Sequence, residues 1–225
     1  CSNNILNEQI HTCIMEYGGR DLLDLINEKN IDLCNYTITN QIISVILFLI
    51  DNKIYNPDFK LENLVYNINN KIVKLIDFED FFYIKKLTPN ILYNLPYTEH
   101  YACPLYIIYR QYYKDNRFIY LNIQLYQLWE LFTTLYILYN EAYLFEVSKE
   151  CNVPIHIYKI NDYKNVNEYL EYIINILTNT KINNNELLNN MKTKFIKIFQ
   201  NFKDNKITIV NNNVIEMIEY LKKYN

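Results

Sequence analysis

Apolar residues recur at helical spacing along most of this 225-residue chain, and half of its residues are hydrophobic. The most apolar run, Ile42 to Ile50, follows Thr39 and Asn40, either of which can cap the first turn of a helix. This run is apolar nearly all round, which predicts a buried helix. A second long apolar run, from Ile123 to Tyr139, predicts another. The chain is therefore large and apolar enough to form a substantial helical core.

Shorter runs with apolar residues three and four apart predict further, amphipathic helices. These runs cover Asp21–Asn30, Val166–Leu177, Glu186–Phe202 and Val214–Lys223. Asn-rich joints at 183–185 and 211–213 are expected to separate the last three helices. Between residues 81 and 110 the pattern is irregular, because Pro89, Pro96 and Pro104 interrupt any long element.

A strand-like pattern occurs in the stretch from Leu64 to Ile76. Leu64-Val65-Tyr66 and Ile72 to Ile76 are short apolar runs joined by Asn67-Ile68-Asn69-Asn70. Because Asn-rich junctions between β-branched runs favour tight turns, the two runs predict a β-hairpin. The sequence as a whole predicts a mainly α-helical fold with a small β-hairpin.

Four polar residues stand at the open end of this hairpin. Asp58, Lys60 and Asn63 lie in the loop that leads into the first strand, and Asp77 follows the second strand. Since a hairpin brings its two ends together, one cation, one amide and two carboxylates are expected to converge. Carboxylates accept protons, lysine balances phosphate charge, and Asn and Asp supply the oxygen ligands that Mg²⁺ prefers. The four residues are therefore candidates for a metal–phosphate site.

The spacing D-x-K-x-x-N, followed after a strand pair by Ile76-Asp77-Phe78, resembles the catalytic and metal-binding loops of the protein-kinase family. The resemblance implies that Asp58 accepts the proton of the attacking hydroxyl group. It also implies that Lys60 balances charge on the γ-phosphoryl group of ATP, and that Asn63 and Asp77 hold Mg²⁺. A lysine two residues after the aspartate is typical of Ser/Thr-type kinases, so the implied substrate is a protein hydroxyl.

The same resemblance places the start of the chain at the end of the small lobe and at the hinge beside the adenine. Ile10 to Tyr17 is the expected last strand of that lobe, ending at Gly18-Gly19. The implied ATP-binding residues are Met15 as gatekeeper, Glu16, Tyr17 and Gly18 through their backbone, Asp21 toward the ribose, and Val65. The expected organisation is the end of the small lobe and the hinge over residues 1–20, and a kinase-like large lobe over residues 21–225.

The rest of the small lobe is largely absent from this sequence. The two glycines of the chain, Gly18 and Gly19, are adjacent, so a glycine-rich phosphate loop cannot form. No strand lysine or helix glutamate of the family's kind precedes Met15. Because positioning supplies most of kinase catalysis, this chain alone is expected to transfer phosphate negligibly. The expected partners are a missing small lobe or upstream segment and a protein substrate.

Several positions depart from the kinase pattern. Asn56-Pro57 stands where His-Arg precedes the catalytic aspartate, and Glu79 replaces the glycine of the metal-binding loop. Gln124 replaces the aspartate that braces the catalytic loop, although its amide could still do so, and Trp129 replaces a glycine. These departures leave open a pseudokinase, an interaction module that keeps the fold without turnover.

A small-molecule phosphotransferase is a further alternative. Ile76-Asp77-Phe78-Glu79 also resembles the I-D-F-E of choline-kinase-like enzymes. Lys60 and the hinge-like Met15-Glu16-Tyr17-Gly18 favour a protein kinase over this alternative.

Composition and charge argue against several other classes of protein. A net charge of −3 argues against nucleic-acid binding through phosphate electrostatics. The five cysteines are scattered and never in C-x-x-C spacing, which indicates reduced residues of an intracellular, cytoplasmic protein. The three histidines are too dispersed to predict a metal site. The apolar run from Val45 to Ile50 is too short to cross a membrane.

Overall fold

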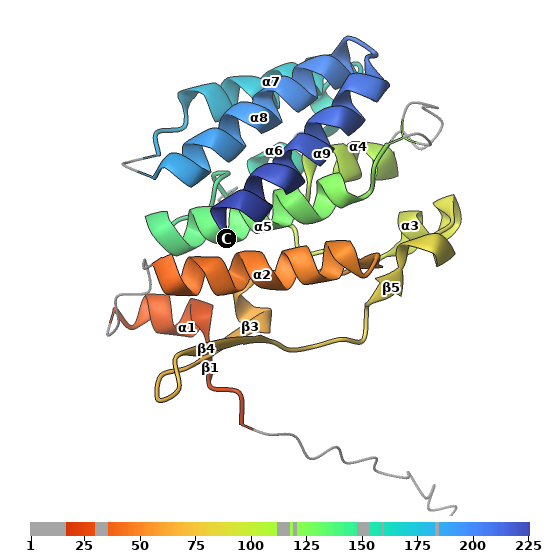
Figure 1. The fold of residues 1–225 in the computed structure, drawn as a ribbon. Coiled ribbons are helices and arrows are strands. Elements are labelled where there is room, and N and C mark those ends of the chain that lie inside the picture. The colour runs from red at the N-terminus through yellow and green to blue at the C-terminus, as the bar shows by residue number, and fades with distance from the viewer. Residues whose placement is uncertain are drawn as a thin grey trace, which may run out of the picture.

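The computed structural model describes residues 17–29, 36–111, 118, 121–147, 154–158, 160–182 and 185–225. Helices dominate these ranges and the strands form small antiparallel sheets, in agreement with the predicted mainly α-helical class (Figure 1). Among the described residues, no helix combines the length and apolar character needed to cross a membrane.

The elements follow one another from the small sheet to a set of C-terminal helices. The helices are α1 (Leu22–Asn27), α2 (Tyr36–Asp51), α3 (Pro89–Asn94), α4 (Pro104–Gln111), α5 (Gln124–Asn140), α6 (Ile155–Tyr158), α7 (Val166–Asn179), α8 (Glu186–Lys203) and α9 (Ile207–Tyr224). The strands are β1 (Arg20–Asp21), β2 (Ile54–Tyr55), β3 (Leu64–Asn67), β4 (Ile72–Leu75) and β5 (Phe82–Tyr83). Three short 3₁₀ turns in the described ranges are η1 (Leu61–Asn63), η2 (Ile84–Lys86) and η4 (Ile160–Asp162).

Helices α2 and α5 form the centre of the molecule. They pack against each other, and α7 and α8 lie on the far side of α5, whereas α9 packs on α8 and also contacts α2 (Figure 1). The sheet of β1, β3 and β4 lies on the opposite side of α2. Nearly every side chain of α5 is buried, as its continuous apolar pattern predicts.

Trp129 lies in the middle of α5 and is wholly buried. Its ring packs edge-on against Phe195 of α8, with the centroids 5.0 Å apart, and also contacts Phe199 at 5.4 Å. Phe132 and Phe145 complete the cluster at 5.6 and 6.2 Å. The large indole therefore joins the central helix to the C-terminal helices.

The predicted β-hairpin is present. Strands β3 and β4 pair antiparallel, with Leu64 opposite Leu75 and Asn67 opposite Ile72. The N–H of Lys71 donates to the carbonyl of Asn67 at 2.8 Å and closes the turn. Strand β1 extends the hairpin to three strands, and β2 pairs with β5 in a second, two-stranded sheet that the sequence did not predict.

The predicted start of helix α2 was wrong. We expected Thr39 or Asn40 to cap the helix, but α2 begins at Tyr36. Thr39 is fully buried, and its hydroxyl shares a 2.6 Å hydrogen bond with the hydroxyl of Tyr139 on α5. Its side chain therefore serves the contact between the two central helices.

The predicted joint at residues 211–213 was also wrong, because α9 runs through it. Asn213 is buried, and its Oδ1 accepts a 3.1 Å hydrogen bond from Nδ2 of Asn201 on α8. The turn between α8 and α9 lies earlier, where Asn205 adopts a φ of +60°. Interhelical hydrogen bonding thus outweighs the turn preference of asparagine here.

Candidate active site

The loop that carries Asp58, Lys60 and Asn63 joins β2 to β3 and rests on α5. Nε2 of Gln127 donates to the carbonyl of Ile54 at 3.0 Å, and the hydroxyl of Thr134 donates to the carbonyl of Phe59 at 3.5 Å. Phe59 and Leu61 are fully buried, whereas Asp58 and Lys60 between and beside them are partly exposed. Phe59 and Leu61 thus anchor the loop in the core, and the residues that alternate with them keep their polar side chains partly exposed.

Lys60 and Asn63 both contact the carboxylate of Asp58. Nζ of Lys60 lies 2.7 Å from Oδ2 of Asp58, and each of these side chains is 20% exposed. Nδ2 of Asn63 donates to the same Oδ2 at 3.1 Å and to the Asp58 carbonyl at 3.0 Å. This orientation leaves the amide oxygen of Asn63, the atom that Mg²⁺ would take, outside these hydrogen bonds.

Thr98 is a site residue that the sequence did not reveal. Its hydroxyl donates to Oδ1 of Asp58 at 2.5 Å and accepts from Nζ of Lys60 at 3.1 Å. Thr98 lies 40 residues after Asp58, so the two residues do not belong to one local sequence motif. The available signal was its place in the irregular, proline-interrupted segment between residues 81 and 110. Both carboxylate oxygens of Asp58 are therefore engaged.

Asp77 lies at the other end of the hairpin. The N–H of Ile76 donates to the carbonyl of Asn63 at 2.9 Å, so Asp77 directly follows the residue paired with Asn63. Asp77 is exposed, and within the described ranges no hydrogen bond or ion pair joins it to Asp58, Lys60 or Asn63. Its φ of +62° is in the left-handed region, which Asp tolerates better than most residues and which often marks functional sites.

A metal at this end of the hairpin would have few protein ligands. No group of three or more His, Cys, Asp or Glu side chains is gathered for a metal in the described part of the chain. Mg²⁺ commonly uses one or two protein oxygens and completes its shell with phosphate and water. Asn63 and Asp77 fit that ligand set in chemistry and in chain position.

Three of the residues assigned to the nucleotide lie together along β3. Asp21 pairs with Val65 across the strands, and a Cβ on Gly18 would lie 2.6 Å from Cγ2 of Val65. Asp21 caps α1, since its Oδ1 accepts from the N–H of Asp24 at 2.8 Å. Tyr17 is 72% exposed.

Gly19 is required by this close packing. It has a φ of +116°, and a Cβ there would lie 2.2 Å from the carbonyl oxygen of Tyr66. Met15 and Glu16, together with most of the predicted strand from Ile10 to Tyr17, lie outside the described residues.

Gln124, whose amide could still have braced the loop, makes no side-chain hydrogen bond to it among the described residues. Its Nε2 donates at 3.4 Å to the carbonyl of Ile50 at the end of α2. Gln127, one turn further along α5, reaches the loop instead. The side chain of Gln124 therefore links α5 to the end of α2.

The segment before α4 is tied to the same loop. Tyr101 is 2% exposed and its hydroxyl donates to Oε2 of Glu62 at 2.9 Å. Burial raises the pKa of Tyr101, so the phenol stays a hydrogen-bond donor. Cys103, just beyond, is buried and free, and burial raises the pKa of its thiol.

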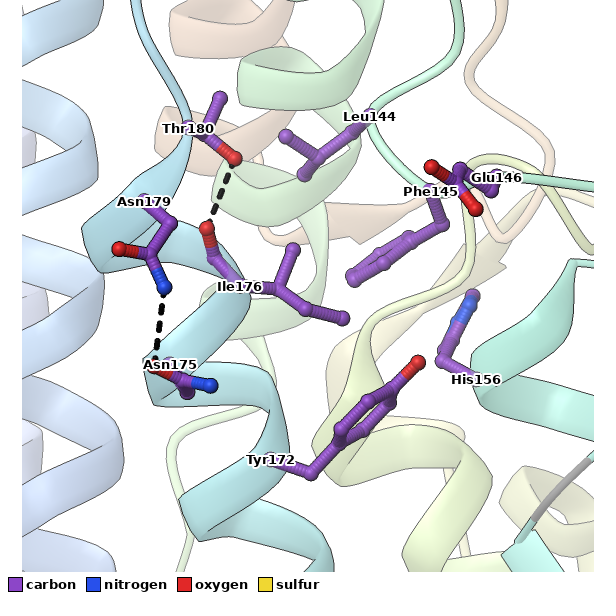
Figure 2. Close-up of a pocket in the computed structure, with 9 residues that line it drawn as sticks. All are labelled: Leu144, Phe145, Glu146, His156, Tyr172, Asn175, Ile176, Asn179 and Thr180. Carbon is purple, nitrogen blue, oxygen red and sulfur yellow. Dashed lines mark hydrogen bonds between the residues drawn. The ribbon is translucent and has the colours of Figure 1, made fainter.

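A cavity of about 460 Å³ lies away from this loop, between the segment after α5, α6 and α7 (Figure 2). Phe145, Tyr172 and Ile176 line it, and the ring of His156 stacks on Phe145 with centroids 3.8 Å apart. His156 is fully buried. Burial is the main reason that its pKa falls to about 3. The neutral imidazole thus packs as a core ring and offers no accessible nitrogen to the cavity.

Comparison with known proteins indicates the class to which this chain is related. Over part of its length it shows homology to serine/threonine-protein kinases. The relatives are serine/threonine-protein kinase 1 sequences of African swine fever virus, 33% identical over 113 residues. The match covers 48% of this chain and 37% of each viral kinase, so it spans well under half the length of these relatives. No protein-family model matches the chain.

Proposed function

We propose that this chain is the large lobe of a divergent Ser/Thr-type protein kinase that transfers the γ-phosphoryl group of ATP to a protein hydroxyl. Asp58 is the proton acceptor and Lys60 balances charge on the transferred group. Asn63 and Asp77 hold Mg²⁺, and Gly18, Asp21 and Val65, together with Met15, Glu16 and Tyr17, form the nucleotide side of the site.

The observation that carries this proposal is the contact set around Asp58. In-line phosphoryl transfer needs an oriented hydroxyl group, a cation near the γ-phosphate and hard oxygen ligands for Mg²⁺. Lys60 and Asn63 contact Asp58 directly, and the hairpin brings Asp77 next to the Asn63–Ile76 pair. The partial homology to viral Ser/Thr kinases supports the same class.

The pseudokinase alternative is favoured by one specific feature. Thr98 occupies Oδ1 of Asp58, while Lys60 and Asn63 occupy Oδ2. A substrate hydroxyl must share or displace the Thr98 contact before Asp58 can accept its proton. An interaction module without turnover would retain this closed arrangement permanently. The small-molecule phosphotransferase is the weaker alternative, since Lys60 lies directly in the site.

The test is a titration of the chain with ATP, with and without Mg²⁺, followed by amide chemical shifts. We expect weak binding that requires Mg²⁺ and shifts the amides of residues 63 and 77. Asp77→Asn should weaken binding about tenfold, equivalent to about 1.4 kcal/mol. Asn also tolerates a positive φ, so this variant removes the charge without disturbing the backbone.

Glu79→Gln is the matched control, because it removes one negative charge from the same exposed loop. Its affinity for Mg²⁺·ATP should stay within about twofold of the wild-type value, roughly 0.4 kcal/mol. Equal affinity of the wild type and Asp77→Asn would contradict the assigned metal site.

A further inference from the structure

Three buried polar atoms, one in the loop of Asp58 and two on the helix α5 that supports it, have no hydrogen-bond partner among the described residues. They are Nδ2 of Asn56, Oε1 of Gln127 and Oε2 of Glu130. The three residues are 1%, 0% and 4% exposed. A buried polar group without a partner costs about 1–3 kcal/mol, so three such groups in one region require an explanation.

The position of Glu130 on α5 places it under this loop. Gln127 holds the carbonyl of Ile54, and Thr134 holds the carbonyl of Phe59. Glu130 is three residues after the first and four before the second, so all three lie on one face of the helix. Glu130 therefore faces the loop between residues 54 and 59, the part that contains Asn56 and Asp58.

The neighbouring amides are fixed in orientation. Oδ1 of Asn56 accepts the N–H of Asp58 at 2.9 Å, so Nδ2 of Asn56 is a free donor. Nε2 of Gln127 donates to Ile54, so Oε1 of Gln127 is a free acceptor. Glu130 thus faces a donor from the loop and carries an acceptor beside it on its own helix.

Only one charge state of Glu130 suits both neighbours. A carboxylate can accept from Asn56, but it would place negative charge against the acceptor oxygen of Gln127. A carboxylic acid accepts from Asn56 through its carbonyl oxygen and donates to Gln127 through its hydroxyl group. The neutral acid therefore has both the acceptor that Asn56 lacks and the donor that Gln127 lacks.

We propose that Glu130 is a neutral positioning residue that links Asn56 to Gln127 and thereby holds the backbone of the catalytic loop at Asp58. This assignment rests on the proposed function, because Asp58 has a catalytic role only there. Glu130 and Gln127 then provide the support from α5 that Gln124, bonded to Ile50, does not provide.

The electrostatic surroundings favour the neutral form. Burial, and secondarily the negative charge of Asp58, raise the pKa of Glu130 well above its ordinary value of 4.5. The groups that interact with its charge are Tyr55 of β2 and Asp58 of the loop, and Cys103 and Tyr106 from the segment at α4. None of these described groups is a cation that would stabilise a carboxylate.

The raised pKa of Glu130 makes the free energy of unfolding depend on pH. The folded protein keeps the Glu130 proton at pH values where the unfolded chain has lost it. This contribution to stability is complete below pH 4.5 and is lost as the pH rises toward the folded-state pKa. Glu130→Gln has the same donor and acceptor but cannot ionise, so it avoids this loss.

The experiment compares urea unfolding of the wild-type chain and Glu130→Gln between pH 5 and pH 8. We expect the variant to become relatively more stable with rising pH, by up to about tenfold in the unfolding equilibrium constant per pH unit. The exposed Glu219→Gln on α9 is the control and should show no such trend. A constant difference across this range, or a Glu130→Gln protein that is destabilised at pH 7, would overturn the proposal.

A second measurement reports on Asp58 directly. The N–H of Asp58 should exchange with solvent as slowly in Glu130→Gln as in the wild type, and faster in Glu130→Met, which has neither donor nor acceptor. Faster exchange in Glu130→Gln would also overturn the proposal. Neither measurement needs nucleotide or turnover, so a failure of the kinase assignment leaves these outcomes interpretable.

Discussion

Asp58 is contacted by side chains from two separate parts of the chain. Lys60 and Asn63 reach it from its own loop, and Thr98 reaches it from the segment before α4. The contacts divide between its two carboxylate oxygens, which restricts rotation of the carboxylate. A restricted carboxylate is suited to orienting a hydroxyl group for transfer.

Thr98→Val should destabilise the chain, because it removes the hydroxyl group but keeps the size and branching of the side chain. A hydrogen bond to a charged group contributes about 1.5–3 kcal/mol, and we expect a loss near the lower end, since the site is partly exposed. Urea denaturation measures this loss, and Thr98→Ser, which keeps the hydroxyl, should retain most of the stability. Equal losses in Val and Ser variants would show that the methyl group matters and the hydroxyl group does not.

Local spacing predicted Asp58, Lys60 and Asn63, because those residues share one loop. Thr98 was not predictable in the same way, since its role depends on how a distant segment folds back. Glu130 did leave a signal, as an acidic residue in an otherwise apolar helical run. The positioning role that we propose for it nevertheless depends on the orientation of two amides, which only the folded structure fixes.

Helix α5 is the element on which the site is built. One face holds the loop through Gln127 and Thr134, and Trp129 connects the helix to Phe195 of α8. Displacement of α5 would therefore move the loop relative to the C-terminal helices.

Trp129→Ala should lower the free energy of unfolding by about 3–5 kcal/mol, because it opens a large cavity among buried aromatic rings. Phe48→Ala is the comparison, since Phe48 is a large aromatic residue of α2 that is 63% exposed. Phe48→Ala should lower the free energy of unfolding by about 0.5 kcal/mol or less. Similar costs for the two variants, measured by thermal or urea unfolding, would contradict the central place of Trp129.

Apolar periodicity predicted the long helices, and the Asn-rich junction between two short apolar runs at residues 64–76 predicted the hairpin. The starts of α2 and α9 were missed because Thr39 and Asn213 make hydrogen bonds to other helices. Residues with cap or turn preferences were thus used for tertiary contacts, which periodicity cannot reveal.

In the molecule as a whole, the polar loop of Asp58 and the end of the β3–β4 hairpin lie in one small region of a mainly helical fold. The sheet of β1, β3 and β4 pairs Asp21 with Val65, which we propose for the nucleotide side of the site, and Asn63 directly precedes β3. The proposed ATP site therefore follows β3, with the phosphate end at Asn63 and the adenine end near Gly18.

The most direct test of this account is an experimental structure of the chain with Mg²⁺ and a non-hydrolysable ATP analogue at high concentration. The account predicts Mg²⁺ at about 2.0–2.1 Å from Oδ1 of Asn63 and from a carboxylate oxygen of Asp77, with the terminal phosphate directed toward Asp58 and Lys60. Nucleotide bound elsewhere, such as in the cavity beside His156, or an Asp77 side chain directed away from Asn63 in the complex, would contradict it.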